Sequence, residues 1–413
     1  MLNVVVLNGG RGAATLIPAL LACQGLHVTS VINAYDDGKS TGDIRRFFGM
    51  LGPSDIRKVQ ELMLPPDNAD YQSNLHVFSY RFPMGSVHDD VLADLGAFAN
   101  GSREDLVGAN FTNGRVRSVL QSFVGEFLAG LNSIEQVIGE QFSFADCSLM
   151  NCIYAGAFLK LNRNIERAAL SMDRLFKLRG TVLPTSIEDK KLVALQENEQ
   201  MLYREAEIVE LRSNVRIERI YLLDKLIDKR PFEKLSIKEK RYYLDKHCCY
   251  VAVSPMVRLA LRQADIIIYA AGTQHSSLYP TYIATGLTQS IADNHSAYKV
   301  FVTNIGADYE TPSYKASDYI RGAHCYLNRS ADARHYRMEE LFDVALVNQS
   351  RLKADETYVE YDEIGFADIA VPHVVDMFES ATSLGKHDGA KVVRTILELY
   401  EASSRLVRCD DLA

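Results

Sequence analysis

The first forty residues most constrain the fold, because they alternate strand, glycine-rich turn, helix and strand. Residues 2–7 (LNVVVL) form a short, valine-rich run that is typical of a buried parallel strand. Residues 8–12 (NGGRG) then form a turn, and an apolar helical pattern covers residues 13–23. Residues 28–33 (VTSVIN) predict a second strand. This order is half of a doubly wound α/β fold, in which ligands bind at the carboxyl ends of the strands.

The turn at residues 8–12 predicts a phosphate or diphosphate site. Glycine lets backbone N–H groups approach an anion closely, and the following helix N-terminus attracts negative charge. Two common motifs do not fit: the dinucleotide fingerprint needs a glycine where Thr15 stands, and the Walker A pattern needs one where Asn33 stands. Arg11 is interpreted either as a bidentate clamp on a diphosphate or as a surface residue over the turn.

A second polar turn, residues 34–42 (AYDDGKSTG), follows the second strand. Asp36 and Asp37 would repel a triphosphate unless a cation lay between them. We interpret the pair as a site for a metal ion, Mg²⁺, or for a substrate hydroxyl. The alternative is an Asx-type turn that caps the next segment.

A third turn, residues 271–277 (AGTQHSS), follows the apolar run of residues 265–270 (DIIIYA), which predicts a buried strand. Its hydroxyl and N–H groups suit phosphate oxygens. His275 in this turn is interpreted either as a phosphate contact or proton shuttle, or as a solvated side chain. Asn304, at the end of the strand expected at residues 299–304, can reach a base or a sugar.

These segments together resemble a known family. The motifs at residues 8–12, 36–42, 44–46 (IRR) and 52–57 (GPSDIR), with later ones at residues 148–161, 178–186, 264–277, 300–304 and 314–319, occur in its order. The chain resembles the 2-phospho-L-lactate transferase (CofD-like) family from residue 4 to about residue 360. It is most similar to the gluconeogenesis-factor (YvcK-like) branch. The resemblance implies a nucleoside-diphosphate-linked ligand, such as a UDP-sugar or a GDP-type compound, and a homodimer.

Three departures from the family pattern concern the site. Ala271 and Thr273 replace the Pro and the first Ser of a Pro-Gly-Ser-x-x-Thr-Ser segment. Residues 144–151 keep Asn151 of a His-Ser-x-Gly-Asn-like segment but lose its His and Gly, and Arg11 stands where a small or hydroxyl residue is usual. We therefore expect substrate details that differ from both branches.

The predicted organisation is one CofD-like nucleotide-binding domain over residues 1–413 with two insertions. Alternating polar and apolar residues predict a small antiparallel β subdomain at residues 181–222, from strands at 191–195, 201–209 and 215–222. Residues 225–247 are highly charged and are expected to form an exposed helical excursion, whereas residues 71–114 look loop-like. The expected fold class is α/β: a doubly wound, mostly parallel, Rossmann-like sheet with flanking helices plus the antiparallel insertion.

Composition excludes several classes of protein. No apolar run approaches the roughly eighteen residues that a membrane span needs, and the start does not resemble a signal peptide, so we expect a cytoplasmic protein without membrane insertion. A formal charge of −8 gives no basic footprint for nucleic acid. The anionic ligand must therefore be bound by local geometry.

Two functional hypotheses follow. One is a nucleotide-sugar sensor that signals without turnover. The other is a transferase that moves a phosphoryl-linked group to an acceptor hydroxyl, with Asp36 and Asp37 as catalytic or Mg²⁺-binding residues. A protein whose site has decayed is a third reading. The expected nucleotide- and phosphate-binding residues are Gly9, Gly10, Arg11, Gly12, Lys39, Ser40, Asn151, Gly272, Thr273, Ser276, Ser277 and Asn304.

Overall fold

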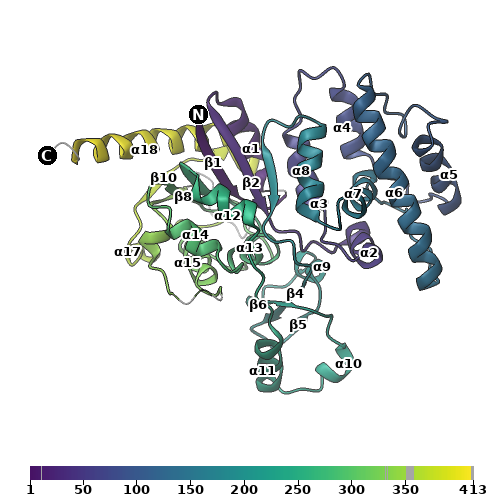
Figure 1. The fold of residues 1–413 in the computed structure, drawn as a ribbon. Coiled ribbons are helices and arrows are strands. Elements are labelled where there is room, and N and C mark those ends of the chain that lie inside the picture. The colour runs from purple at the N-terminus through teal and green to yellow at the C-terminus, as the bar shows by residue number, and fades with distance from the viewer. Residues whose placement is uncertain (11, 331, 333, 350–357, 411–413) are drawn as a thin grey trace.

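The computed structural model describes residues 1–10, 12–330, 332, 334–349 and 358–410, and its centre is a seven-stranded sheet (Figure 1). Every neighbouring pair of strands in this sheet is parallel. The doubly wound α/β prediction is confirmed. The strands, in sheet order, are β10 (His373–Asp376), β9 (Val344–Asn348), β8 (Tyr298–Val302), β7 (Ile266–Tyr269), β1 (Leu2–Leu7), β2 (Leu26–Ile32) and β3 (Thr181–Pro184).

The order of the strands reverses beside β1. From β1 the chain adds β2 and β3 on one side, and it later adds β7 to β10 on the other. Such a reversal in an open α/β sheet leaves a crevice beyond the carboxyl ends of the strands, where ligands bind. The strands next to it are almost wholly buried, in keeping with their Val- and Ile-rich sequences.

The helices between the strands form the outer layers. Helix α7 (Leu149–Lys160) is buried along most of its length and packs on α6 (Gly114–Ile138). A Cβ atom at Gly156 of α7 would lie 1.8 Å from the carbonyl oxygen of Phe123, so only glycine permits this contact. The other helices here are α1 (Ala13–Ala22), α2 (Lys39–Phe48), α3 (Ser54–Leu62), α8 (Ile165–Leu175) and α18 (Gly389–Asp410), which packs on α1.

The loop-like reading of residues 71–114 is wrong. This segment contains α4 (Tyr71–Ser79) and α5 (His88–Ala99). Their apolar residues recur at helical spacing and enter the core. The Asp70 carboxylate accepts hydrogen bonds from the Thr112 and Asn113 amides at 2.9 and 3.0 Å, and so ties the two ends of the segment together.

The small antiparallel sheet is present, with the order β5 (Met201–Leu202), β4 (Lys191–Gln196) and β6 (Ile217–Leu223). Two expected details differ. Thr181–Pro184 pairs with β2 in the parallel sheet, and the strand expected at residues 201–209 ends at Leu202, before helix α9 (Glu205–Val209). A contact with the second turn holds this helix, so its conformation depends on tertiary structure that the alternating pattern does not encode.

The charged segment after β6 is helical. It forms α10 (Lys229–Phe232) and α11 (Ile237–His247), and Ser236 and Glu239 make a capping box at the start of α11. Phe232 and Leu244 pack with residues of the antiparallel sheet in a separate small core. This β5–β4–β6 unit projects from the body of the molecule in Figure 1, while side chains such as Leu192, Ile220 and Leu222 join the main hydrophobic core.

Short elements complete the carboxyl-terminal half. None of the helices in the described residues is long and apolar enough to cross a membrane. The remaining elements are α12 (Pro255–Arg262), a π-helix (Gln274–Leu278), α13 (Tyr279–Tyr282), α14 (Leu287–Ala292), α15 (Ala316–Leu327), α16 (Met338–Leu341), α17 (Glu363–Ala367), β11 (Glu379–Ser380) and β12 (Ser383–His387).

Candidate functional site

A cavity of about 520 Å³ lies where the turns after β1, β2 and β7 meet. Eight of the residues expected from the sequence line it: Gly9, Gly12, Asp36, Lys39, Ser40, Thr273, Ser276 and Ser277. The other lining residues are Gly38, Thr41, Ser54, Asp55, Arg57, Lys58, Arg81, Asp146, Glu205, Ala206, Val209, Glu210 and Arg212.

The first turn packs tightly against its neighbours. A Cβ atom at Gly9 would lie 2.8 Å from the Cβ of Ser277, and one at Gly10 would lie 2.4 Å from Oδ1 of Asp55. Within the described residues, the amides of Gly9 and Gly10 have no hydrogen-bond acceptor. Arg11 lies outside the described residues. The turn therefore offers backbone donors at a place that only glycines can occupy.

The second turn separates the roles of its two aspartates. Asp36 lines the cavity, and its Oδ1 accepts a hydrogen bond from the Gly38 amide at 3.0 Å, which is the Asx-type geometry considered above. Asp37 instead contacts α9: its Oδ1 accepts from the Ala206 amide at 2.9 Å, and its own amide donates to Glu205 at 3.2 Å. Only Asp36 is thus placed to meet a ligand.

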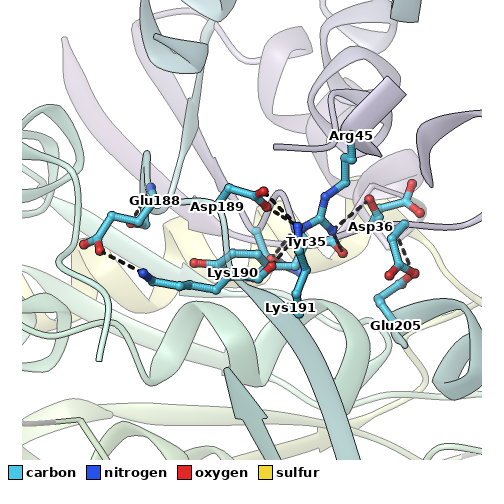
Figure 2. A network of polar contacts seen from close by, with 11 residues as sticks. Tyr35, Asp36, Arg45, Glu188, Asp189, Lys190, Lys191 and Glu205 are labelled. Atoms are coloured by element: carbon cyan, nitrogen blue, oxygen red, sulfur yellow. Dashed lines mark hydrogen bonds and ion pairs between the residues drawn. The ribbon is translucent and has the colours of Figure 1, made fainter. Parts of the chain in front are cut away.

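Arg45 holds the backbone of this turn in position. Its Nη2 donates to Asp189 Oδ1 at 2.6 Å and to the Lys190 carbonyl at 2.7 Å, while its Nη1 donates to the Tyr35 carbonyl at 2.5 Å. Figure 2 shows the guanidinium between Asp189 and the Tyr35–Asp36 backbone. One buried cation therefore joins the second turn to the segment that enters β4.

Carboxylates gather on one side of the cavity. Burial raises the pKa of Asp36, and the nearby charge of Asp55 raises it further. Burial likewise raises the pKa of Glu205 well above its usual range, with the charge of Asp36 as the next cause. Since each carboxylate disfavours ionisation of the other, a cation or a hydrogen-bonding ligand at this side would relieve the repulsion.

Three further basic side chains, which were not predicted as site residues from the sequence, face the same cavity. Arg57 is buried, and its Nη1 donates to the Phe78 carbonyl at 3.0 Å, whereas its Nε has no acceptor in the described structure. Lys58 pairs with Asp55 at 2.7 Å, and Arg81 pairs with Asp146 at 2.6 Å. The motif at residues 52–57 contained the signal for Arg57, but Arg81 and Asp146 come from distant segments.

The third turn already holds an acidic side chain of the protein itself. The buried Glu310 carboxylate accepts hydrogen bonds from the His275 and Ser276 amides, both at 2.9 Å, and from the Ser276 hydroxyl at 2.5 Å. Burial, with the charge of Asp308 second, raises the pKa of Glu310 to about 8. These two backbone donors are therefore occupied by Glu310 rather than open to a phosphate.

Both interpretations of His275 are wrong. Its side chain is 1% exposed and does not line the cavity. The ring packs edge-on against Tyr279, with centroids 4.9 Å apart, and burial lowers its pKa to about 3. The imidazole is a neutral core group.

Four other expected residues, Gly10, Asn151, Gly272 and Asn304, are not among the residues that line the cavity. Asn304 donates to the Gly272 carbonyl at 2.9 Å and accepts from the Gly272 amide at 3.0 Å, so it fixes the third turn. Asn151 is buried, with its Nδ2 3.5 Å from the Ser40 hydroxyl. The two asparagine side chains support the turns that line the cavity.

The described residues contain no group of three Asp, Glu, His or Cys side chains close enough to hold a metal ion. Mg²⁺ is commonly bound by one or two carboxylates together with water and the phosphates of a substrate. Asp36 and Asp55 fit that mode, since both line the cavity and supply oxygen ligands. Asp37 does not fit it, because its carboxylate contacts α9.

Comparisons with known proteins identify the family of the chain. The family model described as "2-phospho-L-lactate transferase CofD" matches residues 4–396. A "Putative gluconeogenesis factor" of Thermotoga maritima is 23% identical over 398 residues, covering 96% of this chain and 98% of the relative. A "Gluconeogenesis factor" of Listeria monocytogenes is also 23% identical, covering 96% of this chain and 95% of the relative.

The fold is shared with a solved structure. A crystal structure of a UPF0052 family protein from Bacillus halodurans matches with a TM-score of 0.65 over 96% of this chain and 100% of its own, at 19% identity.

Proposed function

Because the chain belongs to the 2-phospho-L-lactate transferase (CofD) family, we propose that it binds a nucleoside-diphosphate-linked small molecule, a UDP-sugar or a GDP-type compound, in this cavity. The observation that carries the proposal is the first turn, where the amides of Gly9 and Gly10 lack acceptors among the described residues. A volume of about 520 Å³ suits a ligand of that size.

The charges of the cavity support a diphosphate. Lys58 and Arg81 reach the cavity while held by Asp55 and Asp146, at 2.7 and 2.6 Å. A phosphate oxygen can share these donors, since Lys carries three N–H groups and Arg carries five. The buried Arg57 adds a positive charge that no carboxylate approaches closer than 3.9 Å in the described structure. Local basic groups thus offset the acidic net charge of the chain.

Mg²⁺ is part of the proposal. Asp36 and Asp55 would hold it together with the phosphates of the ligand. Bound there, the ion would neutralise charge between the carboxylates and the diphosphate. Lys58 lies 2.7 Å from Asp55 and performs part of this neutralisation itself, so Mg²⁺ would strengthen binding rather than be indispensable for it.

We infer a regulatory role, in which the bound nucleotide sugar reports metabolic or cell-envelope state to a partner. The names of the relatives favour this reading, since they are called factors. The alternative is a transferase in which Asp36 orients an acceptor hydroxyl next to the diphosphate. It is favoured by the raised pKa of Asp36, because perturbed carboxyls cluster at reacting centres.

The test is a thermal-shift and calorimetric screen of UDP-sugars and GDP compounds, with and without Mg²⁺. We expect saturable stabilisation, since a ligand at 100 times its Kd adds about 2.7 kcal/mol to the free energy of unfolding. Absence of stabilisation by every compound would contradict the proposal.

Asp36→Asn and Asp37→Asn, followed by mass spectrometry of products, separate the two roles. In a transferase Asp36→Asn should lower kcat and kcat/KM together, while Asp37→Asn should leave both close to wild type. In a regulator no product forms, and Asp36→Asn changes affinity modestly, with a gain expected where Mg²⁺ is absent. Wild-type turnover of Asp36→Asn would remove this residue from the reaction.

Two expectations remain predictions at this stage. The resemblance implies a homodimer, which light scattering at several protein concentrations would test. The second expectation is a cytoplasmic location, which fractionation of cells would test.

A further inference from the structure

A row of hydroxyl groups connects the buried Glu310 carboxyl with the cavity. The Ser276 hydroxyl lies 2.5 Å from Glu310 Oε1 and 3.0 Å from the Thr273 hydroxyl. The Thr273 hydroxyl lies 2.8 Å from that of Ser277. Thr273, Ser276 and Ser277 line the cavity, whereas Glu310 is 3% exposed behind them. The four side chains therefore form one continuous hydrogen-bonded chain with a carboxyl at its inner end.

The hydrogen bonds of this row of side chains can run in two directions. The Ser276 hydroxyl has acceptors on both sides, but a hydroxyl carries only one hydrogen. If Glu310 is ionised, Ser276 donates to it, and the hydrogens of Thr273 and Ser277 can follow inward. If Glu310 is protonated, it donates to Ser276, Ser276 donates to Thr273, Thr273 donates to Ser277, and Ser277 donates into the cavity.

We propose that binding of an anionic ligand in this cavity is coupled to uptake of one proton by Glu310, with the hydroxyls of Ser276, Thr273 and Ser277 as the link. The inference rests on the proposed function and adds a form of regulation to it. The proton comes from solvent, and no covalent bond between heavy atoms changes. With Glu310 ionised, Ser277 can donate to an oxygen of the ligand only if one link within the row lacks a hydrogen, whereas with Glu310 protonated every link has one, so the ligand favours the protonated state.

The surroundings of Glu310 raise its pKa above that of an ordinary glutamate. Its Oε2 accepts from the two backbone amides of the third turn, which leaves Oε1 to carry the proton. No Lys or Arg pairs with it in the described part of the chain. Burial and the charge of Asp308 raise its pKa to about 8.

The titration of Glu310 must be distinguished from that of other groups near the hydrogen-bonded row. Asp308 accepts from the Thr311 hydroxyl, which also contacts Tyr319. His275 is neutral, because burial lowers its pKa to about 3. Across the cavity, Asp36 and Glu205 also have raised pKa values. A variant of Glu310 itself is therefore the necessary comparison.

The experiment is calorimetry of UDP-glucose binding across pH and in buffers of different ionisation enthalpy. For the wild type, affinity should fall as pH rises through the Glu310 pKa, by up to about tenfold per pH unit. Proton uptake should approach one per ligand within that range of decline and fall to zero below it, where Glu310 is already protonated in the free protein.

Glu310→Gln is the decisive variant, because its amide oxygen can accept from the two backbone amides while its NH₂ donates to Ser276 at every pH. It should bind with the affinity of the wild type at low pH and lose this pH dependence. An unchanged pH dependence in Glu310→Gln would overturn the proposal. Thr273→Val should also abolish the dependence by breaking the chain, and Thr273→Ser should retain it; a retained dependence in Thr273→Val would contradict the role of the hydroxyls.

A readout without ligand distinguishes failure of this inference from failure of the proposed function. Infrared difference spectroscopy of the unliganded protein should show a protonated carboxyl that persists well above the ordinary glutamate pKa and is missing in Glu310→Gln. If UDP-glucose does not bind but this carboxyl is present, the ligand assignment fails and the proton site stands. If no such carboxyl is seen, the coupling is overturned even where UDP-glucose binds.

Discussion

The turns after β1 and β7 follow neighbouring parallel strands and look alike in sequence, yet they offer different things to a ligand. The first turn, around Gly9 and Gly10, has backbone amides without acceptors among the described residues. In the third turn the amides of His275 and Ser276 are bound by Glu310 at 2.9 Å. The first turn therefore keeps the amides of Gly9 and Gly10 for a ligand, whereas Glu310 occupies two amides of the third turn.

The difference shows that a glycine- and hydroxyl-rich turn after a strand predicts an anion site without saying which anion fills it. Amide donors at a helix start attract any carboxylate or phosphate that the fold brings near. Glu310 comes from the segment after β8, and its carboxyl group accepts hydrogen bonds from two amides of the third turn. We therefore expect the diphosphate at the first turn and a hydroxyl-contacted group at the third.

The largest effect is expected from Gly9→Ala. Its new Cβ would lie 2.8 Å from Ser277 Cβ and 3.0 Å from Ser277 Oγ, so the two turns must separate. UDP-sugar affinity should fall at least tenfold, which corresponds to about 1.4 kcal/mol. Calorimetry measures this effect. Gly85→Ala is the matched control, because a Cβ there meets nothing within 4 Å; equal affinities of the two variants would contradict the placement of the ligand.

A smaller effect is expected from Ser277→Ala, which removes a hydroxyl of the third turn from the cavity. Loss of one hydrogen bond should weaken binding by about 0.5–1.5 kcal/mol without unfolding the protein. Titrations at constant pH measure the change. A loss as large as that of Gly9→Ala would mean that the third turn contributes as much as the first, and the distinction between them would fail.

The smallest effect on the ligand is expected from Asp37→Ala. Its carboxylate accepts from the Ala206 amide at 2.9 Å and holds α9 against the second turn. Stability should fall by about 1 kcal/mol, as for loss of one hydrogen bond, with affinity changed less than twofold. Urea denaturation and calorimetry measure the two quantities. A large loss of affinity with unchanged stability would return Asp37 to the binding site.

Sequence alone predicted β1, β2, β7, β8 and the three turns because both signals are local, whereas it placed β3 in the insertion and did not predict β10. Buried parallel strands are continuous apolar runs, and each turn directly follows one of them. The helices α4 and α5 were missed because polar and glycine residues around them obscured their apolar spacing.

The unpredicted parts of the site depend on contacts between distant segments. Arg81 meets Asp146 across 65 positions of sequence, and Glu310 reaches Ser276 across 34. No spacing rule encodes such pairs, because they exist only after the sheet and helices have packed. His275 shows the same limit, since nothing in its turn indicated the tyrosines that bury it.

The most direct test of the central claim is a crystal structure with a bound UDP-sugar or GDP compound. The account predicts diphosphate oxygens within hydrogen-bonding distance of the Gly9 and Gly10 amides, with Glu310 still bound to the amides of His275 and Ser276. A diphosphate seated on the third turn with Glu310 displaced, or a ligand outside this cavity, would contradict it.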